Sequence, residues 1–394
     1  MTPTLSPSST DALLGVYRKP PMELVRGAGV ELFDADGKAY LDFVAGIAVN
    51  ALGYGDPGLE QAMREAMEGS LIHTSNLYRT QAGECLAERL VELSFADRVF
   101  FCNSGAEANE GAFKLARRWG RAKGGTAKHE IVALRGAFHG RLFATLAATD
   151  RPQYRAPFRP LAGGISIVER DLDELDAVLN HETVAAVIAE PIQGEGGVRV
   201  LDPKFLQALR ALTQERGILL ILDEIQCGYG RTGKFWAYES ADIVPDILTV
   251  AKPMAGGLPM GAILTTSQVA DAMQPGDHGT TFGGGPFVSA VALHVLDRLS
   301  DAAMLKHVRE RGAQVKKGLD AIAKSSATVR AVRGTGLMWG IDVAEPAKDI
   351  VARAMELGLL ICSAGEHTIR LLPPLVVTKA DVERGLALLK QAIG

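Results

Sequence analysis

Between about residues 98 and 266, short apolar runs alternate with segments of helical period. The runs cover residues 98–102, 130–134, 165–168, 183–188, 217–222, 246–250 and 261–264. Nearly continuous apolar runs of this length are typical of strands that are buried on both faces of a sheet. The helical segments between them, such as 106–119 and 203–216, imply parallel strands joined by right-handed crossovers. The sequence therefore predicts an α/β fold with a mostly parallel central sheet.

The alternation stops at the glycine-rich stretch 276–286, which we take as a domain boundary. We expect residues 61–286 to form a large ligand-binding domain and residues 287–394 a smaller α+β domain, because strand-like runs and helical patterns mix there. Two strand-like segments, 30–33 and 38–43, are joined through Asp36-Gly37 and predict a hairpin. We expect residues 13–60 to pack with the small domain and residues 1–12, which are mostly Ser, Thr and Pro, to be disordered.

Composition excludes several classes of protein. The chain has 394 residues, of which 47% are hydrophobic and 22% charged, and this excludes a disordered, fibrous or coiled-coil protein. The net charge is −4 and the sequence has no long basic run, so we expect no surface that binds nucleic acid. Small molecules are therefore the expected partners. No apolar stretch is long enough to span a bilayer, and the first residues resemble no targeting signal. The cysteines are far apart and form no C-x-x-C, so we expect no disulfide framework, no metal site and a cytoplasmic location.

Chemically active residues follow several of the predicted strands. Ligands of open parallel sheets bind outside the carboxyl ends of the strands, so these positions are the first candidates for a site. Asn103-Ser104-Gly105-Ala106-Glu107 follows the first run, with Ser104 and Glu107 spaced as a capping box. The free amides and the dipole of a helix that begins there would bind an anion such as phosphate. An ordinary capped helix is the alternative interpretation of this segment.

A carboxylate and a lysine end two other apolar runs. Asp223 follows 217–222 and Lys252 follows 246–250, while Phe138 and Arg141 follow 130–134. A half-desolvated lysine has a lowered pKa and reacts with carbonyl groups. Asp223 and Lys252 could also form a structural ion pair. Taken together, a phosphate cradle, an aromatic plate, a buried acid and a reactive lysine are what pyridoxal phosphate requires.

Two readings from other classes compete with this one. Gly228-Tyr-Gly-Arg-Thr-Gly233 matches the G-x-G-x-x-G pattern of nicotinamide-binding sites, but five residues separate it from the strand and no convincing helix follows, which favours a turn-rich loop. A regulator that binds the cofactor without turnover is the second alternative, and the chain has no spare length for a DNA-binding domain.

At these residues the chain resembles the class-III, ω-amino-acid aminotransferases, and within them the acetylornithine aminotransferases. The resemblance runs from about residue 13 to 394, and its most specific motifs are 103–109, 138–141, 189–195, 222–226, 230–234 and 245–252. It implies the fold type I architecture of pyridoxal-phosphate enzymes, with a large and a small domain. It also implies a homodimer whose active sites are shared between subunits.

The resemblance assigns cofactor contacts to individual residues. Lys252 resembles the lysine that binds the cofactor's aldehyde, Asp223 the partner of the pyridine nitrogen, and Gln226 the residue beside the ring hydroxyl. Phe138 would cover the ring. The phosphate would be held by the N-terminal segment Ser104, Gly105 and Ala106 and, across the dimer, by Thr281.

The resemblance also assigns substrate contacts. Arg141 would bind the α-carboxylate of an acylated ornithine, and Arg370 that of glutamate or 2-oxoglutarate. Glu195 would mask Arg370 when glutamate is absent, and Thr280 would lie near the substrate. The implied reaction transfers the terminal amine of N2-acetylornithine to 2-oxoglutarate in arginine biosynthesis. N-succinylornithine, N-acyl-lysine, ornithine and 4-aminobutyrate remain as alternative substrates.

The chain departs from the family pattern at two places. Gly53-Tyr-Gly-Asp-Pro57 stands where the family usually has Gly-His-x-His-Pro, and Pro253-Met254-Ala255 stands where glycines are usual. The first departure bears on substrate preference and the second on the loop after Lys252. Gly46 occupies a position where ornithine aminotransferases tend to carry an aromatic residue, which would leave room here for an acyl group.

Overall fold

The computed structural model describes residues 12–17 and 21–394, and residues 1–11 of the stretch expected to be disordered lie outside the described residues. Its largest sheet has seven strands in the order β4-β12-β11-β10-β7-β5-β6. All the predicted apolar runs form strands of this sheet: β4 (Arg98–Cys102), β5 (Glu130–Leu134), β6 (Ile165–Val168), β7 (Val184–Ala189), β10 (Leu219–Asp223), β11 (Ile247–Val250) and β12 (Gly261–Thr265). β12 pairs antiparallel with both β4 and β11 and so runs opposite to the other six strands, which confirms the prediction of a mostly parallel sheet.

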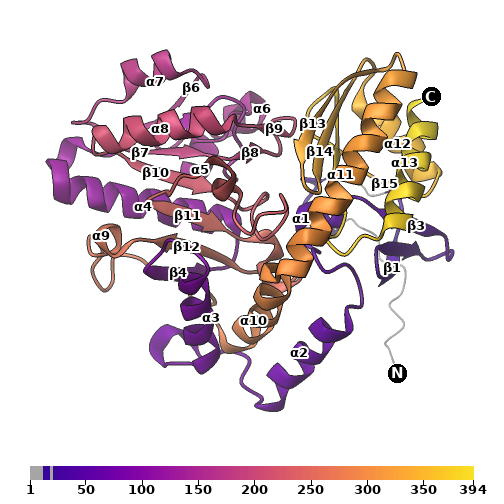
Figure 1. Cartoon of the computed structure of the whole chain (residues 1–394). Helices are drawn as coiled ribbons and strands as arrows, with labels where there is room; N and C mark the ends of the chain where they lie inside the picture. Colours follow the sequence, from indigo (N-terminus) through magenta and orange to yellow (C-terminus); the bar gives the residue numbers. More distant parts are fainter. Residues whose placement is uncertain (1–11, 18–20) are drawn as a thin grey trace.

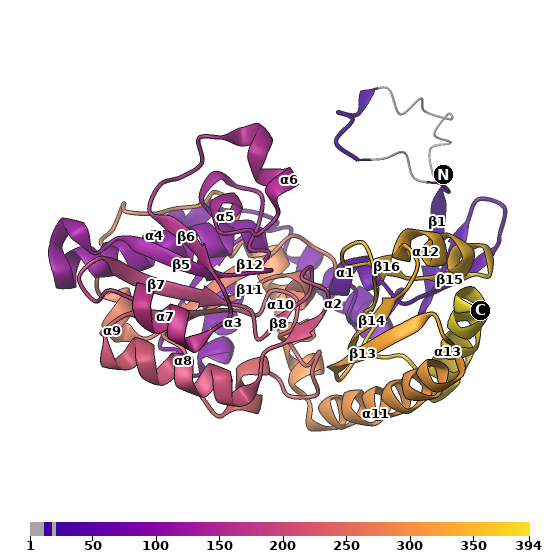
Figure 2. The same cartoon turned by 90° about the horizontal axis from the view of Figure 1, so that it is seen from above.

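Helices cover both faces of this sheet. Helix α4 (Gly105–Gly124) packs against one face, and α8 (Pro203–Glu215) lies on the other, beside α7 (Leu172–Val178) (Figures 1 and 2). Successive residues of β10 show why the strand is apolar throughout. Leu220 and Leu222 pack in the core cluster that includes α8, whereas Ile221 packs in the cluster that includes α4.

A second unit contains the C-terminal sheet. Its antiparallel strands are β13 (Val329–Thr335), β14 (Met338–Val343), β17 (Thr368–Leu371) and β16 (Cys362–Ser363). The long helix α11 (Ala302–Ser325) packs on β13 and on α13 (Lys379–Ile393), which also contacts α12 (Ala347–Glu356). The predicted hairpin is confirmed as β2 (Glu31–Asp34) and β3 (Ala39–Asp42), flanked by β1 (Leu24–Ala28) and β15 (Leu359–Leu360). Through β15 this small sheet joins the N-terminal segment to the C-terminal part of the chain.

The remaining elements connect these sheets. Helix α10 (Pro286–Ser300) packs against α2 (Pro57–Glu68), α3 (Gln81–Glu92) and the 3-10 turn η6 (Lys252–Ala255). The short elements are α1 (Ala45–Ala48), α5 (Phe143–Ala147), α6 (Pro152–Arg155), α9 (Ser267–Ala270), β8 (Ile192–Gln193), β9 (Arg199–Val200), η2 (Ser75–Leu77), η3 (Gly125–Ala127), η4 (Ala156–Phe158) and η5 (Ala237–Ala241). Among the described helices, none combines the length and apolarity needed to cross a membrane.

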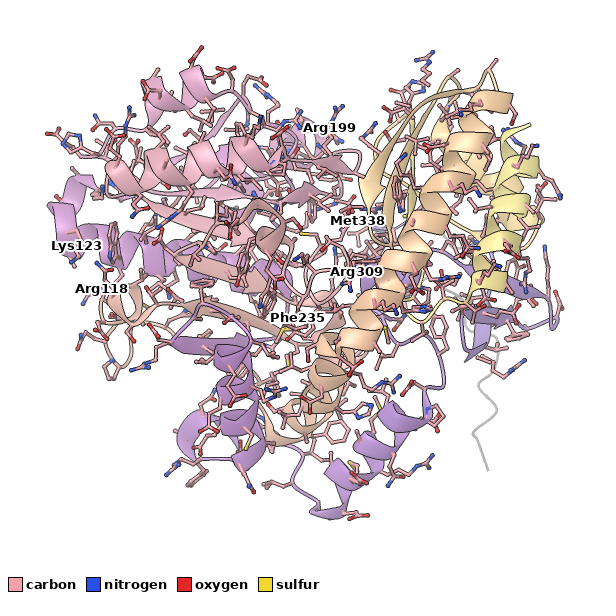
Figure 3. The ribbon with its side chains drawn as sticks, in the orientation of Figure 1. Arg118, Lys123, Arg199, Phe235, Arg309 and Met338 are labelled. Atoms are coloured by element: carbon pink, nitrogen blue, oxygen red, sulfur yellow. The ribbon has the colours of Figure 1, made fainter. Side chains whose placement is uncertain are left out.

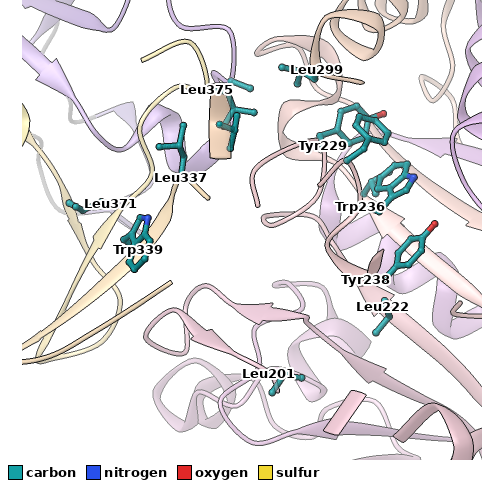
Figure 4. Packing of buried hydrophobic residues seen from close by; sticks show 14 of the residues in the cluster. Leu201, Leu222, Tyr229, Trp236, Tyr238, Leu299, Leu337, Trp339, Leu371 and Leu375 are labelled. Carbon is teal, nitrogen blue, oxygen red and sulfur yellow. The ribbon is translucent and has the colours of Figure 1, made fainter. Parts of the chain in front are cut away.

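The glycine-rich segment 228–233 forms a buried turn at the junction of the two units, followed by η5, so the nicotinamide reading is wrong and the turn-rich loop is confirmed. Arg231 donates hydrogen bonds from this turn to the carbonyls of Leu337 and Pro373. Arg309 of α11 donates to the Gly233 carbonyl, and its side chain can be followed in Figure 3. Figure 4 shows that aromatic side chains near this turn and apolar side chains of the second unit belong to one buried cluster.

Candidate active site

A cavity of about 410 Å³ opens at the carboxyl ends of the parallel strands. Ligand pockets of proteins usually measure about 300 to 1,000 Å³, so the cavity can hold a cofactor-sized molecule. Its lining contains nine of the residues singled out from the sequence: Ser104, Gly105, Ala106, Phe138, Arg141, Glu195, Asp223, Gln226 and Lys252.

One end of the cavity is the N-terminus of α4. Ser104 is the N-cap of this helix, and its hydroxyl accepts a hydrogen bond from the Glu107 amide. The capping box is only half formed, because the Glu107 carboxylate accepts from the amide of Asn103 at 2.6 Å rather than from that of Ser104. The amides of Gly105 and Ala106 have no hydrogen-bond acceptor among the described residues and are therefore available to an anion.

A buried carboxylate lies deeper in the cavity. Asp223, the last residue of β10, is 4% exposed. Its Oδ2 atom lies 2.8 Å from Nδ1 of His139 and 2.7 Å from Nδ2 of Asn109, and its Oδ1 atom accepts from the Ile225 amide. Thr249 in turn donates to Oδ1 of Asn109, which fixes the amide orientation. These contacts fix the orientation of the Asp223 carboxylate at the wall of the cavity.

Lys252 follows β11 as the first residue of η6. Burial lowers the pKa of its amine to about 8, and the positive charge of Arg370 contributes in the same direction. The amine makes no hydrogen bond to any described residue. At pH 7 about a tenth of such an amine is unprotonated, against about one part in 3,000 for an ordinary lysine, and the unprotonated amine is the state in which lysine is a nucleophile.

Arg370 does not itself line the cavity, but it connects the C-terminal sheet to two residues that do, Glu195 and Gln226. It lies in β17, is 2% exposed, and donates to the carboxylate of Glu195, which sits in the turn between β8 and β9. Its guanidinium also donates to Oε1 of Gln226 at 3.1 Å and to Sγ of Cys362 at 3.4 Å. Burial by itself would raise the pKa of Glu195, but the charge and hydrogen bond of Arg370 lower it. The expected pairing of Glu195 with Arg370 is therefore present.

Arg141 differs from Arg370 in its surroundings. It is exposed at the cavity wall and makes no hydrogen bond or ion pair within the described part of the chain. Its guanidinium carbon lies 3.6 Å from the ring centre of Tyr154 and 5.8 Å from that of Phe138. One arginine of the site is thus already neutralised, and the other is available to an anion.

The two threonines predicted near the substrate and the phosphate lie outside the cavity lining. Thr280 is next to it, since its hydroxyl accepts a hydrogen bond from Nδ2 of Asn103 at 3.2 Å. Thr281 is exposed, as is Phe282 beside it.

The departures from the family pattern have structural roles. The hydroxyl of Tyr54 donates to Asp42 at 2.6 Å, and Asp42 also accepts from the Ala45 amide at the start of α1. Residues 45–48 all have positive φ, from 50° to 67°, so α1 is a left-handed turn that leads into the cavity residue Val49. Asp56 is the N-cap of α2 and pairs with Arg298. Neither Tyr54 nor Asp56 lines the cavity.

Sequence reasoning gave no role to several residues of the site. Glu190 directly follows the apolar strand β7 and Asp223 ends the apolar strand β10, so the same signal could have found Glu190. Burial raises the pKa of Glu190 to about 7, and its carboxyl accepts a hydrogen bond from the Phe138 amide. Asn109 and Tyr154 gave no comparable signal, because their contacts exist only after folding.

Solved structures share this fold. The ornithine aminotransferase of Toxoplasma gondii superimposes with a TM-score of 0.93 at 29% identity, covering 97% of this chain and 92% of that one. The N-acetylornithine aminotransferase of Stenotrophomonas maltophilia gives a TM-score of 0.84 at 37% identity, covering 95% and 96%. The fold is therefore the one used by aminotransferases.

The chain belongs to the class-III aminotransferase family, whose model matches residues 16–393. The acetylornithine aminotransferase of Gloeobacter violaceus is 47% identical over 381 residues, covering 96% of this chain and 94% of the relative. The mitochondrial acetylornithine aminotransferase of Alnus glutinosa is 44% identical, covering 97% of this chain and 85% of the relative. The chain is thus an aminotransferase that depends on pyridoxal phosphate, as members of this family do.

The residues present fit this cofactor. The open amides at the start of α4 suit a phosphate, and the amine of Lys252 suits an aldehyde. The Oδ1 atom of Asp223 has one donor among the described residues, which leaves a lone pair for a protonated ring nitrogen. Phe138 supplies an aromatic wall.

Proposed function

We propose that this aminotransferase transfers the terminal amine of N2-acetylornithine to 2-oxoglutarate, giving N-acetylglutamate 5-semialdehyde and glutamate, a step of arginine biosynthesis. The observation that carries the proposal is the contrast between Arg141, which lines the cavity without a hydrogen-bond partner among the described residues, and Arg370, which pairs with the lining residue Glu195. A reaction of this kind accepts one amino donor by its far end and another by its α-amino acid head. The names of the relatives with 42–47% identity support the same substrate.

The residues of the cavity divide the work. When bound, pyridoxal phosphate supplies an aldehyde that links to amines and a ring that accepts the electron pair left by a departing proton. Lys252 would hold the cofactor's aldehyde carbon and carry the proton to and from the substrate's terminal carbon, for which an amine of pKa about 8 is suited. Asp223 would keep the ring nitrogen protonated. Ser104, Gly105 and Ala106 would bind the phosphate, with Phe138 and Gln226 against the ring.

The two arginines would hold different substrates. Arg141 would bind the α-carboxylate of acetylornithine, while Glu195 neutralises Arg370 and so withholds it from that carboxylate. In the second half-reaction the α-carboxylate of 2-oxoglutarate would displace Glu195 from Arg370. Thr280, beside Asn103, would complete the substrate side.

The proposal includes a homodimer in which Thr281 reaches the partner's phosphate site. Large apolar side chains near this segment support it, because Phe282 is 64%, Leu77 80% and Tyr78 73% exposed.

The proposed location is the cytoplasm, where a chain with four free cysteines would stay reduced. The proposed domain division remains 61–286 and 287–394, with 13–60 packed on the smaller part. Sedimentation equilibrium tests the dimer.

Steady-state kinetics on a substrate panel tests the proposed reaction. The purified enzyme, loaded with cofactor, is assayed with 2-oxoglutarate and each of acetylornithine, succinylornithine, N-acetyl-lysine, ornithine and 4-aminobutyrate. We expect the highest kcat/KM for acetylornithine. A higher value for any other amine would replace acetylornithine as the substrate, and no turnover of any of them would overturn the proposal.

A further inference from the structure

Tyr154 stacks on the arginine that we assign to the substrate's carboxylate. It lies on the short helix α6, and its ring centre is 3.6 Å from the guanidinium carbon of Arg141. Phe138 contacts the same guanidinium from a greater distance, 5.8 Å. Both distances are within the range of about 6 Å over which a cation is attracted to an aromatic face. The Tyr154 contact is the closer of the two.

The stack leaves the donor edge of Arg141 free. A guanidinium stacks through its flat face, whereas its N–H groups point outward in the plane of the group. Arg141 donates no hydrogen bond to a described residue, so its planar fork can receive both oxygens of a carboxylate. The aromatic ring therefore determines the plane in which a carboxylate must arrive.

The backbone that carries Tyr154 is tied to neighbouring segments. Arg151, the N-cap of α6, donates to the carbonyl of Asp150 at 2.7 Å and to the carbonyl of Glu195. The carboxylate of Asp150 is buried and accepts from the Gly136 amide at 2.8 Å. The Tyr154 amide completes the turn by donating to the Arg151 carbonyl. Helix α6 is thus tied to the same segment that carries Glu195.

We propose that Tyr154 is a positioning residue that fixes the plane of Arg141 and thereby sets the distance between the substrate's reacting amine and its carboxylate. This inference rests on the proposed function. In acetylornithine the reacting carbon and the carboxyl carbon are four bonds apart, in 4-aminobutyrate three and in an N-acyl-lysine five. When the guanidinium of Arg141 is fixed, a substrate of one of these lengths binds best. When the guanidinium can move, the site discriminates less among substrates of different length.

Three variants of the cofactor-loaded enzyme test this role. Tyr154→Leu removes the aromatic face, Tyr154→Phe retains it without the hydroxyl, and Arg141→Ala removes the cation. Phe33→Leu is the matched control, because Phe33 stacks on Arg26 at 3.7 Å in the β1–β2 pair, outside the cavity. The readouts are KM and kcat for acetylornithine, the ratio of kcat/KM between acetylornithine and N-acetyl-lysine, and the Ki of N2-acetylnorvaline, which has the carboxylate but lacks the amine.

For Tyr154→Leu we expect KM and Ki to rise about five-fold with kcat nearly unchanged, and the preference for acetylornithine to fall. Tyr154→Phe and Phe33→Leu should behave like the unchanged enzyme. Adding Tyr154→Leu to Arg141→Ala should have no further effect. An unchanged Ki in Tyr154→Leu, an equal loss in Tyr154→Phe, or a persistent loss without Arg141 would each overturn the inference.

Failure of the proposed function would look different. In that case the unchanged enzyme would prefer another amine of the panel, and the same variants would be measured with that amine. The inference would still predict the five-fold rise in KM for any preferred amine that carries a carboxylate. If Tyr154→Leu lost turnover only with glutamate, this result would contradict the positioning role of Tyr154.

Discussion

Arg370 and Glu195 form an ion pair between β17 of the C-terminal antiparallel sheet and the turn that joins β8 to β9. Arg370 is almost fully buried, so its charge depends on this carboxylate and on the Gln226 and Cys362 contacts. A buried cation that has lost its partner is strongly destabilised. A substrate carboxylate that displaces Glu195 therefore has to reproduce the same charge-assisted hydrogen bonds.

Arg370→Ala is expected to impair one half-reaction more than the other. Removing one partner of a buried charged pair usually costs about 2 to 5 kcal/mol, and here the cost should fall on glutamate and 2-oxoglutarate. The half-reaction with acetylornithine should be impaired less, because its proposed carboxylate partner, Arg141, is unchanged. Single-turnover rates for the two half-reactions measure the difference. Equal losses in both would mean that Arg370 does not select the α-amino acid head.

Glu195→Ala should change amine preference in the opposite direction. Without the carboxylate, Arg370 would be open to the α-carboxylate of any donor from the start. We expect kcat/KM for α-amines to rise about ten-fold relative to terminal amines, which corresponds to about 1.4 kcal/mol. Glu195→Gln, which retains a hydrogen bond without the charge, should give a smaller rise. The proposed role of Glu195 fails if competition assays show the same preference in all three proteins.

Asp223→Asn should lower kcat without unfolding the protein. Asparagine has nearly the same shape and can still accept from His139, but it carries no charge to hold the ring nitrogen protonated. Loss of one preorganised electrostatic contact in an active site costs about 100- to 1,000-fold in rate, and we expect a fall of about this size. Asp34→Asn is the control, since Asp34 accepts from Tyr40 at 2.8 Å and lies outside the cavity. Near-normal kcat in Asp223→Asn would remove Asp223 from the mechanism.

The lowered pKa of Lys252 should appear in the cofactor-free protein. Folding moves this pKa from 10.5 to about 8, so between these values the unfolded chain binds a proton that the folded chain does not. Stability therefore rises with pH across this window, and the full cost of the charged amine is present below pH 8.

Lys252→Met removes this dependence. In urea unfolding below pH 8, the free energy of unfolding of the methionine variant should exceed that of the unchanged protein by up to about 3 kcal/mol. This difference should shrink as the pH rises. A gap that stays constant with pH would show that Lys252 has an ordinary pKa in the folded protein.

The sequence predicted the seven-stranded sheet better than the C-terminal antiparallel sheet. Runs such as 184–189 are buried on both faces, so each residue carries the signal. β13 gave none, because its residues are only partly buried and Arg330 and Arg333 interrupt the apolar pattern. Its position depends on pairing with β14, which only the folded chain provides.

The same distinction applies to the site. Ser104, Asp223 and Lys252 could be predicted because each lies at or just after the carboxyl end of an apolar strand, and the carboxyl ends of such strands meet at one edge. The stacking of Tyr154 on Arg141 and the contact of Gln226 with Arg370 could not be predicted. Each contact joins two segments that no helical or strand repeat relates in the sequence, so no pattern of residues indicates it.

Arg231→Met should destabilise the junction between the two units. Arg231 is 2% exposed, has no carboxylate partner among the described residues, and burial lowers its pKa to about 9. Its hydrogen bonds satisfy the carbonyls of Leu337 and Pro373, which methionine would leave buried without donors. Removing the buried charge recovers part of this loss, so we expect a net loss of about 3 kcal/mol.

Arg309→Met is the matched control for this variant. Arg309 binds the same loop through the Gly233 carbonyl at 2.6 Å, but its side chain is exposed. Water can replace its hydrogen bond, so the loss should stay below about 1 kcal/mol. Urea unfolding of both variants gives the comparison. If the two variants lose similar amounts of unfolding free energy, the buried hydrogen bonds of Arg231 do not stabilise the junction more than an exposed contact does.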